Sequence, residues 1–331
     1  MDYLCLGKEK IISVLLAMSI LLSFFRLFII EVDSKDYSSA AKKMLEGFFS
    51  MEESIDISEF GIMPEELGGL FSSVIKNEPY LFFVDRNMSY SYERGGAVIS
   101  VRPRYKMSRA EKEKAVDFCR QRITEMAKKA CGGEGEKAIF FHDLICENFE
   151  YDEELKNDNI YDFFLTGKGT CQAYTLAYMA VLRNSGIDSV FVASDTIGHI
   201  WNLVKIDGEW YHADLTWDDG EQISRRHFLL SDKIARERGH KDWYSTENIT
   251  CVSDTYANVD FDLLLYFSSG SGDADHNGQV EILDLMLLRG VGAKGVQICK
   301  KCADLDLDGN VEDSDTPLLR KRILEQYLQD N

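Results

Sequence analysis

The chain has 331 residues, of which 45% are hydrophobic and 11% aromatic, and a formal net charge of −19. This length allows about two domains, each large enough for its own core, and the composition excludes a disordered chain. The acidity makes nucleic acid an unfavourable partner, because binding phosphates requires a basic surface. It suits a highly soluble protein, or carboxylates gathered as ligands for a hard cation.

The first 31 residues contain an apolar run, Ile11 to Ile30, which only Arg26 interrupts and which two lysines precede. That order is typical of a secretory signal peptide. A run of about 20 apolar residues would also cross a bilayer, so a membrane anchor is the alternative. Either interpretation exports the rest of the chain, and we expect a secreted or cell-surface protein.

Export from the cell affects how the cysteines are interpreted. Cys5 lies in the targeting segment, which leaves seven, so at least one thiol is free or pairs with another chain. Cys299 and Cys302 form a C-x-x-C pair, which favours a tight disulfide or two free thiols over zinc, because zinc needs two more ligands.

Residues 32–108 are predicted to form an N-terminal extension with short strands. A helical stretch is expected near residues 40–49. Alternating runs at 80–85, 88–93 and 97–105 predict strands separated by glycine-containing turns.

Residues 109–265 are predicted to form an α+β domain, with helices first and strands after them. The spacing of Ser108 and Glu111 is that of a capping box, which begins a helix that reaches about Ala130. Further helices are predicted over residues 136–149 and 171–184, and strands over residues 190–193, 199–206 and 209–217. Asp207-Gly208 is a strong two-residue turn between the last two strands.

Cys171 stands in the first turn of the third helix, where unpaired N–H groups and the helix dipole both favour a thiolate. A thiolate nucleophile needs a base nearby and a third group that orients the base. If Asp207 and Gly208 are the turn residues, His199 and Asp214 share one face of the hairpin, with Cα atoms about 7–8 Å apart. A three-residue turn would put them on opposite faces.

Each of these residues taken alone also has a structural interpretation: Cys171 as a buried thiol, His199 as a strand histidine satisfied by its neighbours. Their combination favours a Cys-His-Asp triad. Four further histidines show no paired spacing typical of metal ligands, namely His142, His212, His227 and His240. The sequence GKGT before Cys171 lacks the upstream glycine of a phosphate-binding loop.

The segments GTCQAYTLAYMAVLRNSGI and GHIWNLVKIDGEWYHADLTWDD resemble the bacterial transglutaminase-like superfamily. The resemblance covers about residues 109–235 and implies a papain-like core, with helices packed on an antiparallel sheet. It also implies that Cys171 is the nucleophile, His199 the base and Asp214 the residue that orients the base. Trp201, Asn202 and Asp218 lie in matching stretches and receive no role from the sequence.

The chemistry expected of such a site is acyl transfer on a peptide or amide substrate, without a catalytic cofactor. Backbone N–H groups at the helix start, including that of Cys171, are the natural oxyanion donors, and the side chain of Gln172 is a weaker candidate. Water as the second acceptor makes the enzyme a peptidase or amidase, and a lysine amine makes it a crosslinking transglutaminase. A catalytically silent binding subunit is the third alternative.

After a linker at residues 266–272, an acidic twelve-residue pattern occurs twice at an offset of 31 residues. Each copy has oxygen-bearing residues at positions 1, 3, 5 and 12 and glycine at position 6, which is the spacing of an EF-hand calcium loop. Position 7 supplies a backbone carbonyl. The predicted ligands of two Ca²⁺ ions are Asp273, Asp275, Asn277, Gln279 and Asp284, then Asp304, Asp306, Asp308, Asn310 and Asp315.

Each loop is predicted to lead into one helix, without a helix before the loop. This duplicated unit, residues 273–328, resembles the type I dockerin module, a small all-α calcium-binding domain. The resemblance implies docking to a cohesin module of a cellulosomal scaffold. The positions that read cohesin in that family correspond to Ile282-Leu283 and Asp313-Ser314, which differ from the common Ser-Thr pair and leave the cohesin specificity open.

Overall fold

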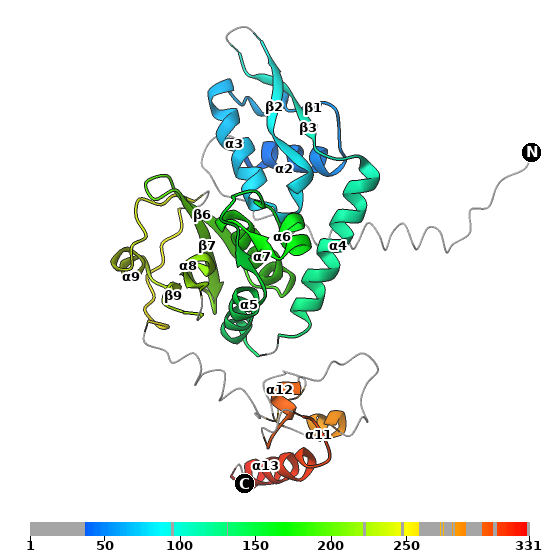
Figure 1. Cartoon of the computed structure of the whole chain (residues 1–331), viewed down its shortest axis with the longest axis vertical. Helices are drawn as coiled ribbons and strands as arrows, with labels where there is room; N and C mark the ends of the chain where they lie inside the picture. Colours follow the sequence, from blue (N-terminus) through cyan, green and yellow to red (C-terminus); the bar gives the residue numbers. More distant parts are fainter. Residues whose placement is uncertain are drawn as a thin grey trace, which may run out of the picture. The chain divides into compact units, whose positions relative to one another are not determined.

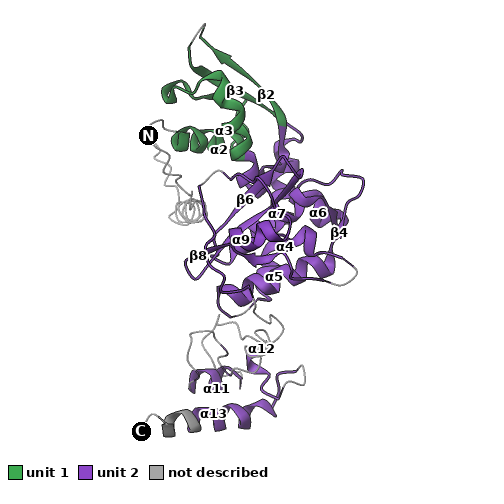
Figure 2. Cartoon of the chain, turned by 90° about the vertical axis from the view of Figure 1, so that its left-hand side faces the viewer, with its two compact units in different colours: residues 1–74, 86–104 green, residues 75–85, 105–331 purple. Residues whose placement is uncertain are grey.

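The computed structural model describes residues 37–93, 96–130, 132–220, 223–245 and 248–257, and in the C-terminal region 272, 274, 280, 282–288, 300–306 and 310–329. The chain divides into two compact units (Figure 2). The first contains residues up to Val74 and Arg86–Arg104, and the second contains Ile75–Asp85 and everything from Tyr105 onwards. The N-terminal apolar run lies outside the described residues. Among the described helices, none combines the length and the apolar character that crossing a bilayer would require.

The first unit contains two amphipathic helices and a three-stranded sheet in the order β1-β3-β2. The helices are α2 (Tyr37–Phe49) and α3 (Pro64–Asn77), and the strands are β1 (Ile55–Asp56), β2 (Val84–Tyr92) and β3 (Val98–Tyr105), with a 3₁₀ turn η1 at Ser58–Phe60. The helix near residues 40–49 and the strands at 88–93 and 97–105 are therefore confirmed.

Two local predictions in this region are wrong or incomplete. Residues 80–83 belong to a 3₁₀ helix, η2 (Pro79–Phe83), and the strand begins only at Val84. Leu81, Phe82 and Phe83 are all buried, so this apolar run does not alternate between a core face and a solvent face. No helix was predicted over α3, whose two adjacent glycines weaken its helical signal.

The second unit has an α+β fold in which one helix is almost wholly buried. This helix, α7 (Cys171–Asn184), packs mainly against the three helices that precede it and against the first two strands of an antiparallel sheet (Figure 1). The helices are α4 (Arg109–Ala127), α5 (Glu134–Asn148) and α6 (Ile160–Thr166), and the sheet order is β6 (Ser189–Ser194), β7 (His199–Ile206), β8 (Glu209–Ala213) and β9 (Phe228–Leu230). Every residue from Ala173 to Leu182 is buried, which explains why α7 is apolar nearly all round.

The start of α4 confirms the predicted capping box. The Ser108 side chain accepts the amide of Glu111, and the Glu111 carboxylate accepts the Ser108 amide at 2.8 Å. These two hydrogen bonds satisfy N–H groups that have no partner within the helix. The helix ends at Ala127, close to the predicted Ala130.

The hairpin between β7 and β8 has the predicted two-residue turn. Ile206 pairs with Glu209 and Asn202 with Ala213, so Asp207 and Gly208 are the only unpaired residues between the strands. Both have positive φ, 51° and 90°, as a type I′ turn requires.

The strand predicted over residues 209–217 is too long. β8 ends at Ala213, Asp214 caps the next helix, and Leu215–Asp218 form the short helix α8. At this point the Asp214 carboxylate accepts the amide of Trp217 and so begins α8, while the Asp214 amide donates to the carbonyl of His227 at 3.0 Å.

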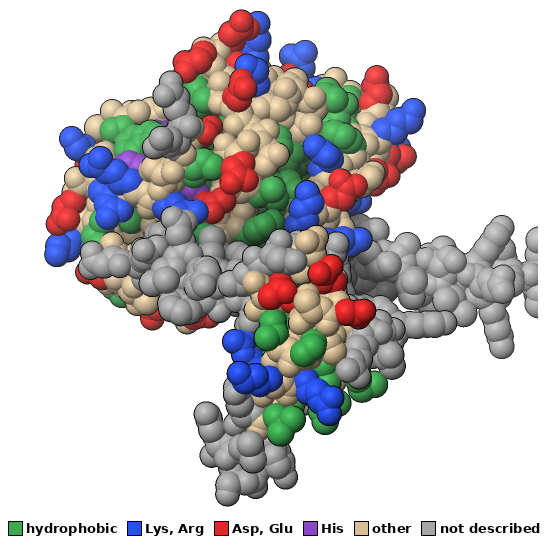
Figure 3. Space-filling model, turned by 60° about the horizontal axis from the view of Figure 1, so that its bottom comes forward, with side chains coloured by type: hydrophobic (Ala, Val, Ile, Leu, Met, Phe, Trp, Pro, Cys, Tyr) green, Lys and Arg blue, Asp and Glu red, His purple; other side chains and the backbone are tan. Residues whose placement is uncertain are grey.

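The described C-terminal residues contain three helices: α11 (Ile282–Leu288), α12 (Lys300–Ala303) and α13 (Asp315–Gln329). α11 packs against α13. The helices predicted after the two acidic loops are confirmed, but α12 directly precedes the second loop, where no helix was expected. On the face shown in Figure 3, acidic and basic side chains are interspersed, so the net negative charge forms no single acidic region there.

Gly208→Ala is expected to lower the free energy of unfolding by roughly 1–2 kcal/mol, because a side chain at this φ is strained. Urea denaturation would measure the change. The control is Gly68→Ala within α3, where an added Cβ meets nothing within 4 Å and alanine favours the helix. A Gly208→Ala protein as stable as the wild type would contradict the turn.

Candidate active site

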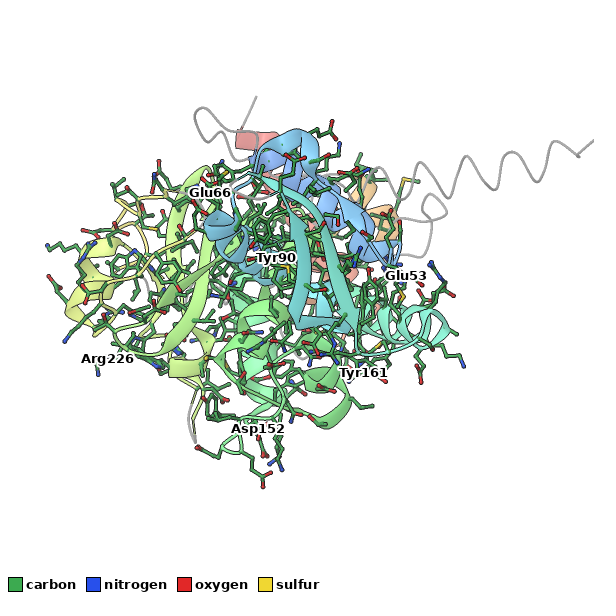
Figure 4. All side chains as sticks on the ribbon, turned by 90° about the horizontal axis from the view of Figure 1, so that it is seen from above. Glu53, Glu66, Tyr90, Asp152, Tyr161 and Arg226 are labelled. Carbon is green, nitrogen blue, oxygen red and sulfur yellow. The ribbon has the colours of Figure 1, made fainter. Side chains whose placement is uncertain are left out.

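One carboxylate holds the loop that precedes α6 and that is hydrogen-bonded to the residue before α7. Asp152, labelled in Figure 4, accepts backbone hydrogen bonds from Glu154, Lys156 and Asn157 over 2.9–3.1 Å. The carbonyl of Asn157 in turn accepts the amide of Thr170 at 2.9 Å. Because Thr170 immediately precedes α7, this loop determines where the helix begins.

Cys171 is the first residue of α7, and its side chain is partly exposed. The other described cysteines are buried: Cys119, Cys146, Cys251 and Cys302. Thr170 makes no side-chain hydrogen bond to the helix, so the cap supplies no partner for the first-turn amides. Gln172, the weaker oxyanion candidate, donates its side-chain amide to the carbonyl of Asp158 at 2.9 Å and is engaged there.

The hairpin brings His199 and Asp214 together. His199 is the first residue of β7, and its Nε2 lies 2.7 Å from Asp214 Oδ2. Asp214 is 1% exposed and His199 is 8% exposed, so the contact is shielded from water. The predicted register therefore produces the predicted proximity, although Asp214 acts from a helix cap and not from a strand.

Hydrogen bonds control the protonation of this pair. Burial alone would lower the pKa of His199, but hydrogen bonds to Asp214 and Cys171 outweigh it and raise the pKa to about 9. Burial alone would raise the pKa of Asp214, but hydrogen bonds from His199 and His240 lower it to about 2. At neutral pH the pair is an imidazolium and a carboxylate.

Two indole rings enclose His199. The Trp217 ring lies 4.9 Å from the imidazole with an interplanar angle of 8°, and the Trp201 ring lies 5.7 Å away at 19°. Trp201 is buried and Trp217 is 37% exposed, so one indole belongs to the core and the other covers the imidazole from the solvent side. Asn202, the neighbour of Trp201, donates to the carbonyl of Thr175 at 3.1 Å and so ties β7 to α7.

His240 is a part of this arrangement that the sequence analysis missed. Its Nε2 lies 2.9 Å from Asp214 Oδ2, and its ring is fully buried. His240 lies 26 residues beyond Asp214, in a stretch without strand or metal-ligand periodicity. Only the glycine before it carries a local signal, which marks the end of a helix and says nothing about Asp214.

A second cluster contains residue types that bind metals, but its histidine carries a proton on the nitrogen that would face the metal. His212, Asp232 and Cys251 place their ligand atoms within 4.8 Å of one another. Trp201 Nε1 donates to His212 Nδ1 at 2.9 Å, so the imidazole proton is on Nε2, which lies 2.9 Å from Asp232. Nε2 therefore has no lone pair for a metal, and burial raises the pKa of the Cys251 thiol. These residues form a hydrogen-bond network.

His142 connects two carboxylates and gives Asp218 a role. Its ring nitrogens lie 2.9 Å from Asp143 and 3.3 Å from Asp218. Burial would lower the pKa of His142, but these two hydrogen bonds raise it. Arg225 donates twice to Asp143, and Asp218 accepts the amide of His227, so this network anchors the segment after α8.

The calcium-loop residues are only partly described. The carboxylates of Asp304, Asp306 and Asp315 place oxygen atoms within 4.8 Å of one another, which fits the oxygen-rich coordination of Ca²⁺. Asp284 and Asp315, the two position-12 residues, are both fully buried and accept equivalent amides from Ala274 and Leu305. Asn310 is described. The remaining predicted ligands, Asp273, Asp275, Asn277, Gln279 and Asp308, lie outside the described residues.

Iodoacetamide is expected to alkylate Cys171 while Cys119, Cys146 and Cys251 remain unmodified, because burial protects these three thiols and raises their pKa values. Peptide mass spectrometry would locate the label. Denaturant should make all four react, which controls for detection. Equal labelling in the folded protein would contradict the described burial.

Comparison with protein-family models gives one match in this region. Residues 120–215 match the model of the transglutaminase-like superfamily, and this stretch contains Cys171, His199 and Asp214. The match does not extend to residues 273–328. No curated protein matches the chain.

Three solved structures have low identity to the chain. A TGase crystal structure has 15% identity and a TM-score of 0.31, covering 55% of this chain and 60% of that one. A putative cysteine protease from Cytophaga hutchinsonii has 16% identity and a TM-score of 0.27, covering 40% of this chain and 48% of that one. A putative protease from Parabacteroides distasonis ATCC 8503 has 15% identity and a TM-score of 0.23, covering 39% of this chain and 35% of that one. The chain spans less than two thirds of each of these structures.

The family match covers the region in which α7 packs on the antiparallel sheet and in which the three candidate residues lie. Residues 120–215 of this chain form a transglutaminase-like superfamily core.

Proposed function

We propose that this protein is an exported thiol hydrolase that cleaves peptide or amide bonds by acyl transfer. The observation that carries the proposal is the position of His199, which is hydrogen-bonded to Asp214 and lies close enough to Cys171 for the thiol to raise its pKa. A nucleophile, a base and a group that orients the base are the minimum that this chemistry requires.

In the first step, the Cys171 sulfur attacks the amide carbonyl carbon. Asp214 engages Nε2 of His199, so Nδ1 is the nitrogen that faces the sulfur and gives its proton to the leaving amine. The products of this step are a thioester on Cys171 and a free amine. The negative charge that develops on the carbonyl oxygen is favoured at the amide end of α7, where the helix dipole is positive.

In the second step, a water molecule attacks the thioester carbonyl and transfers a proton to Nδ1 of His199. The C–S bond breaks, and the products are a carboxylic acid and the Cys171 thiolate, paired again with the imidazolium. A primary amine in place of water would give an isopeptide crosslink. Hydrogen bonds from His199 and His240 keep the pKa of Asp214 low, so Asp214 stays ionised and holds the imidazole in one orientation through both steps.

We further propose that residues 273–328 are a calcium-dependent docking module of the dockerin type that binds a cohesin. Three carboxylates at the spacing of a calcium loop support this proposal. So does the equivalent position of Asp284 and Asp315 in the two copies. Ile282 and Leu283, at the positions expected to contact a cohesin, are 66% and 37% exposed. Such a module would place the hydrolase on an extracellular scaffold, in line with the expected export.

Incubation with a library of peptide amides, followed by acid quenching, is expected to leave an acyl adduct on Cys171. Intact and peptide mass spectrometry would detect it. Cys171→Ala should abolish both the adduct and product release, and Asp214→Asn should lower kcat by roughly 10⁴-fold.

Cys119→Ala is the matched control for the adduct experiment, because Cys119 is a buried thiol outside the site. A second arm adds a primary amine: release of acid supports the hydrolase, whereas amide formation in preference to acid indicates crosslinking. Turnover that is equal in the wild type and in Cys171→Ala, or absent from both across the library, would refute the enzyme proposal.

Calorimetric titration is expected to show two Ca²⁺ ions per chain, and Asp315→Asn should reduce this to one because it removes a carboxylate from the second loop. The matched control is Asp313→Asn, since Asp313 is exposed and lies between ligand positions. Chelation should abolish cohesin binding. Unchanged stoichiometry in Asp315→Asn, or cohesin binding that survives chelation, would refute the docking module.

A further inference from the structure

Asp214 Oδ2 accepts from two imidazoles. His199 Nε2 is 2.7 Å away and His240 Nε2 is 2.9 Å away, and both contacts are buried. The other carboxylate oxygen, Oδ1, accepts the amide of Trp217 at 3.2 Å. The charge on one oxygen is therefore shared between the proposed base and a histidine that has no contact with Cys171 in the described structure.

Local structure determines where His240 lies. Helix α9 (Asp232–Glu237) ends in a Schellman motif, in which the amide of His240 bonds the carbonyl of Ala235 and that of Gly239 bonds the carbonyl of Arg236. Gly239 has φ 111°, a conformation that favours glycine. This turn directs the next residue, His240, back toward the site.

The same two indoles that enclose His199 also contact His240. The Trp201 ring lies 4.6 Å from the His240 ring and the Trp217 ring lies 4.4 Å from it. Both imidazoles are therefore packed between fixed aromatic rings, and neither is positioned by its hydrogen bond alone. The packing of both rings therefore fixes the two hydrogen bonds to Asp214.

The surroundings favour neutral His240 with its proton on Nε2. Its Nδ1 is buried without a hydrogen-bond partner, so a proton there would be an unsatisfied buried donor. The titratable groups that face it are Asp214, His199, His212 from β8 and His227 from the segment before β9. A second positive charge would be repelled by the His199 imidazolium. His240 therefore acts as a neutral donor to Asp214.

We propose that His240 is a positioning residue that shares the Asp214 oxygen with His199 and so limits how strongly Asp214 holds the His199 proton. His199 must give up a proton in the first step, and too tight a hold on the imidazolium would slow that transfer. The catalytic role of His240 rests on the proposed function. Its effect on the hydrogen bond between Asp214 and His199 does not depend on that function.

The test is the pKa of His199, measured by NMR on protein with labelled histidine, with the His199 signal assigned through His199→Gln. His240→Phe removes the donor, and His199 should then titrate higher by roughly half a unit to one unit, the value of one neutral hydrogen bond. His240→Gln places an amide nitrogen near the former Nε2 and should restore the wild-type value. His240→Asn is equally polar, but its nitrogen falls short and should behave like the phenylalanine variant.

His227→Phe is the matched control, because the His227 ring lies beside His240 and Trp217 but makes no described hydrogen bond to Asp214. The His227 backbone carbonyl accepts the Asp214 amide, and phenylalanine retains that bond. It should leave the His199 pKa unchanged. The proposal is overturned if His199 titrates as in the wild type, or lower, in folded His240→Asn and His240→Phe, or if His240→Gln shifts it as much as they do. Turnover is not needed, so an inactive protein with the expected shifts would refute the proposed function alone.

Discussion

A carboxylate without access to water has to be satisfied by hydrogen bonds, and Asp214 imposes this requirement on the second unit. Its three donors come from separate segments: His199 from β7, the Trp217 amide from α8, and His240 from the turn after α9. Losing one donor would leave part of a buried charge uncompensated, which is far more costly than losing a surface ion pair. The hairpin, the short helix and the final turn are therefore coupled through one side chain.

The same constraint governs the other buried histidines. His142 links α5 to Asp218 at the end of α8, and His212 links β8 to Asp232 at the start of α9. Each imidazole pairs with a carboxylate from a distant segment, which satisfies two polar groups that the core would otherwise exclude. This explains how a chain with six histidines can bury several of them.

Cys171 is at the point where a buried helix reaches solvent. The body of α7 is packed on all sides, whereas Cys171 in its first turn is partly exposed. A rigid, apolar helix with a fixed start holds the thiol in one place relative to the hairpin, and the Asp152 loop determines that start. The position of the thiol therefore depends on the packing of α7 and on the loop that Asp152 holds. Under the proposed mechanism, the reactivity of the thiol depends on the neighbouring imidazole.

The sequence by itself determined the features that arise within a few residues. The Ser108–Glu111 capping box, helix Cys171–Asn184 and the Asp207-Gly208 turn are local, because each depends on neighbouring backbone groups or on the periodicity of one helix. The turn alone was enough to place His199 near Asp214. Only the tertiary structure decided the rest: the 3₁₀ helix at Pro79–Phe83, the departure of Asp214 from its strand, and the approach of His240. The approach of His240 depends on a contact between residues far apart in the sequence, and a single buried side chain leaves no periodic signal that would reveal its partner.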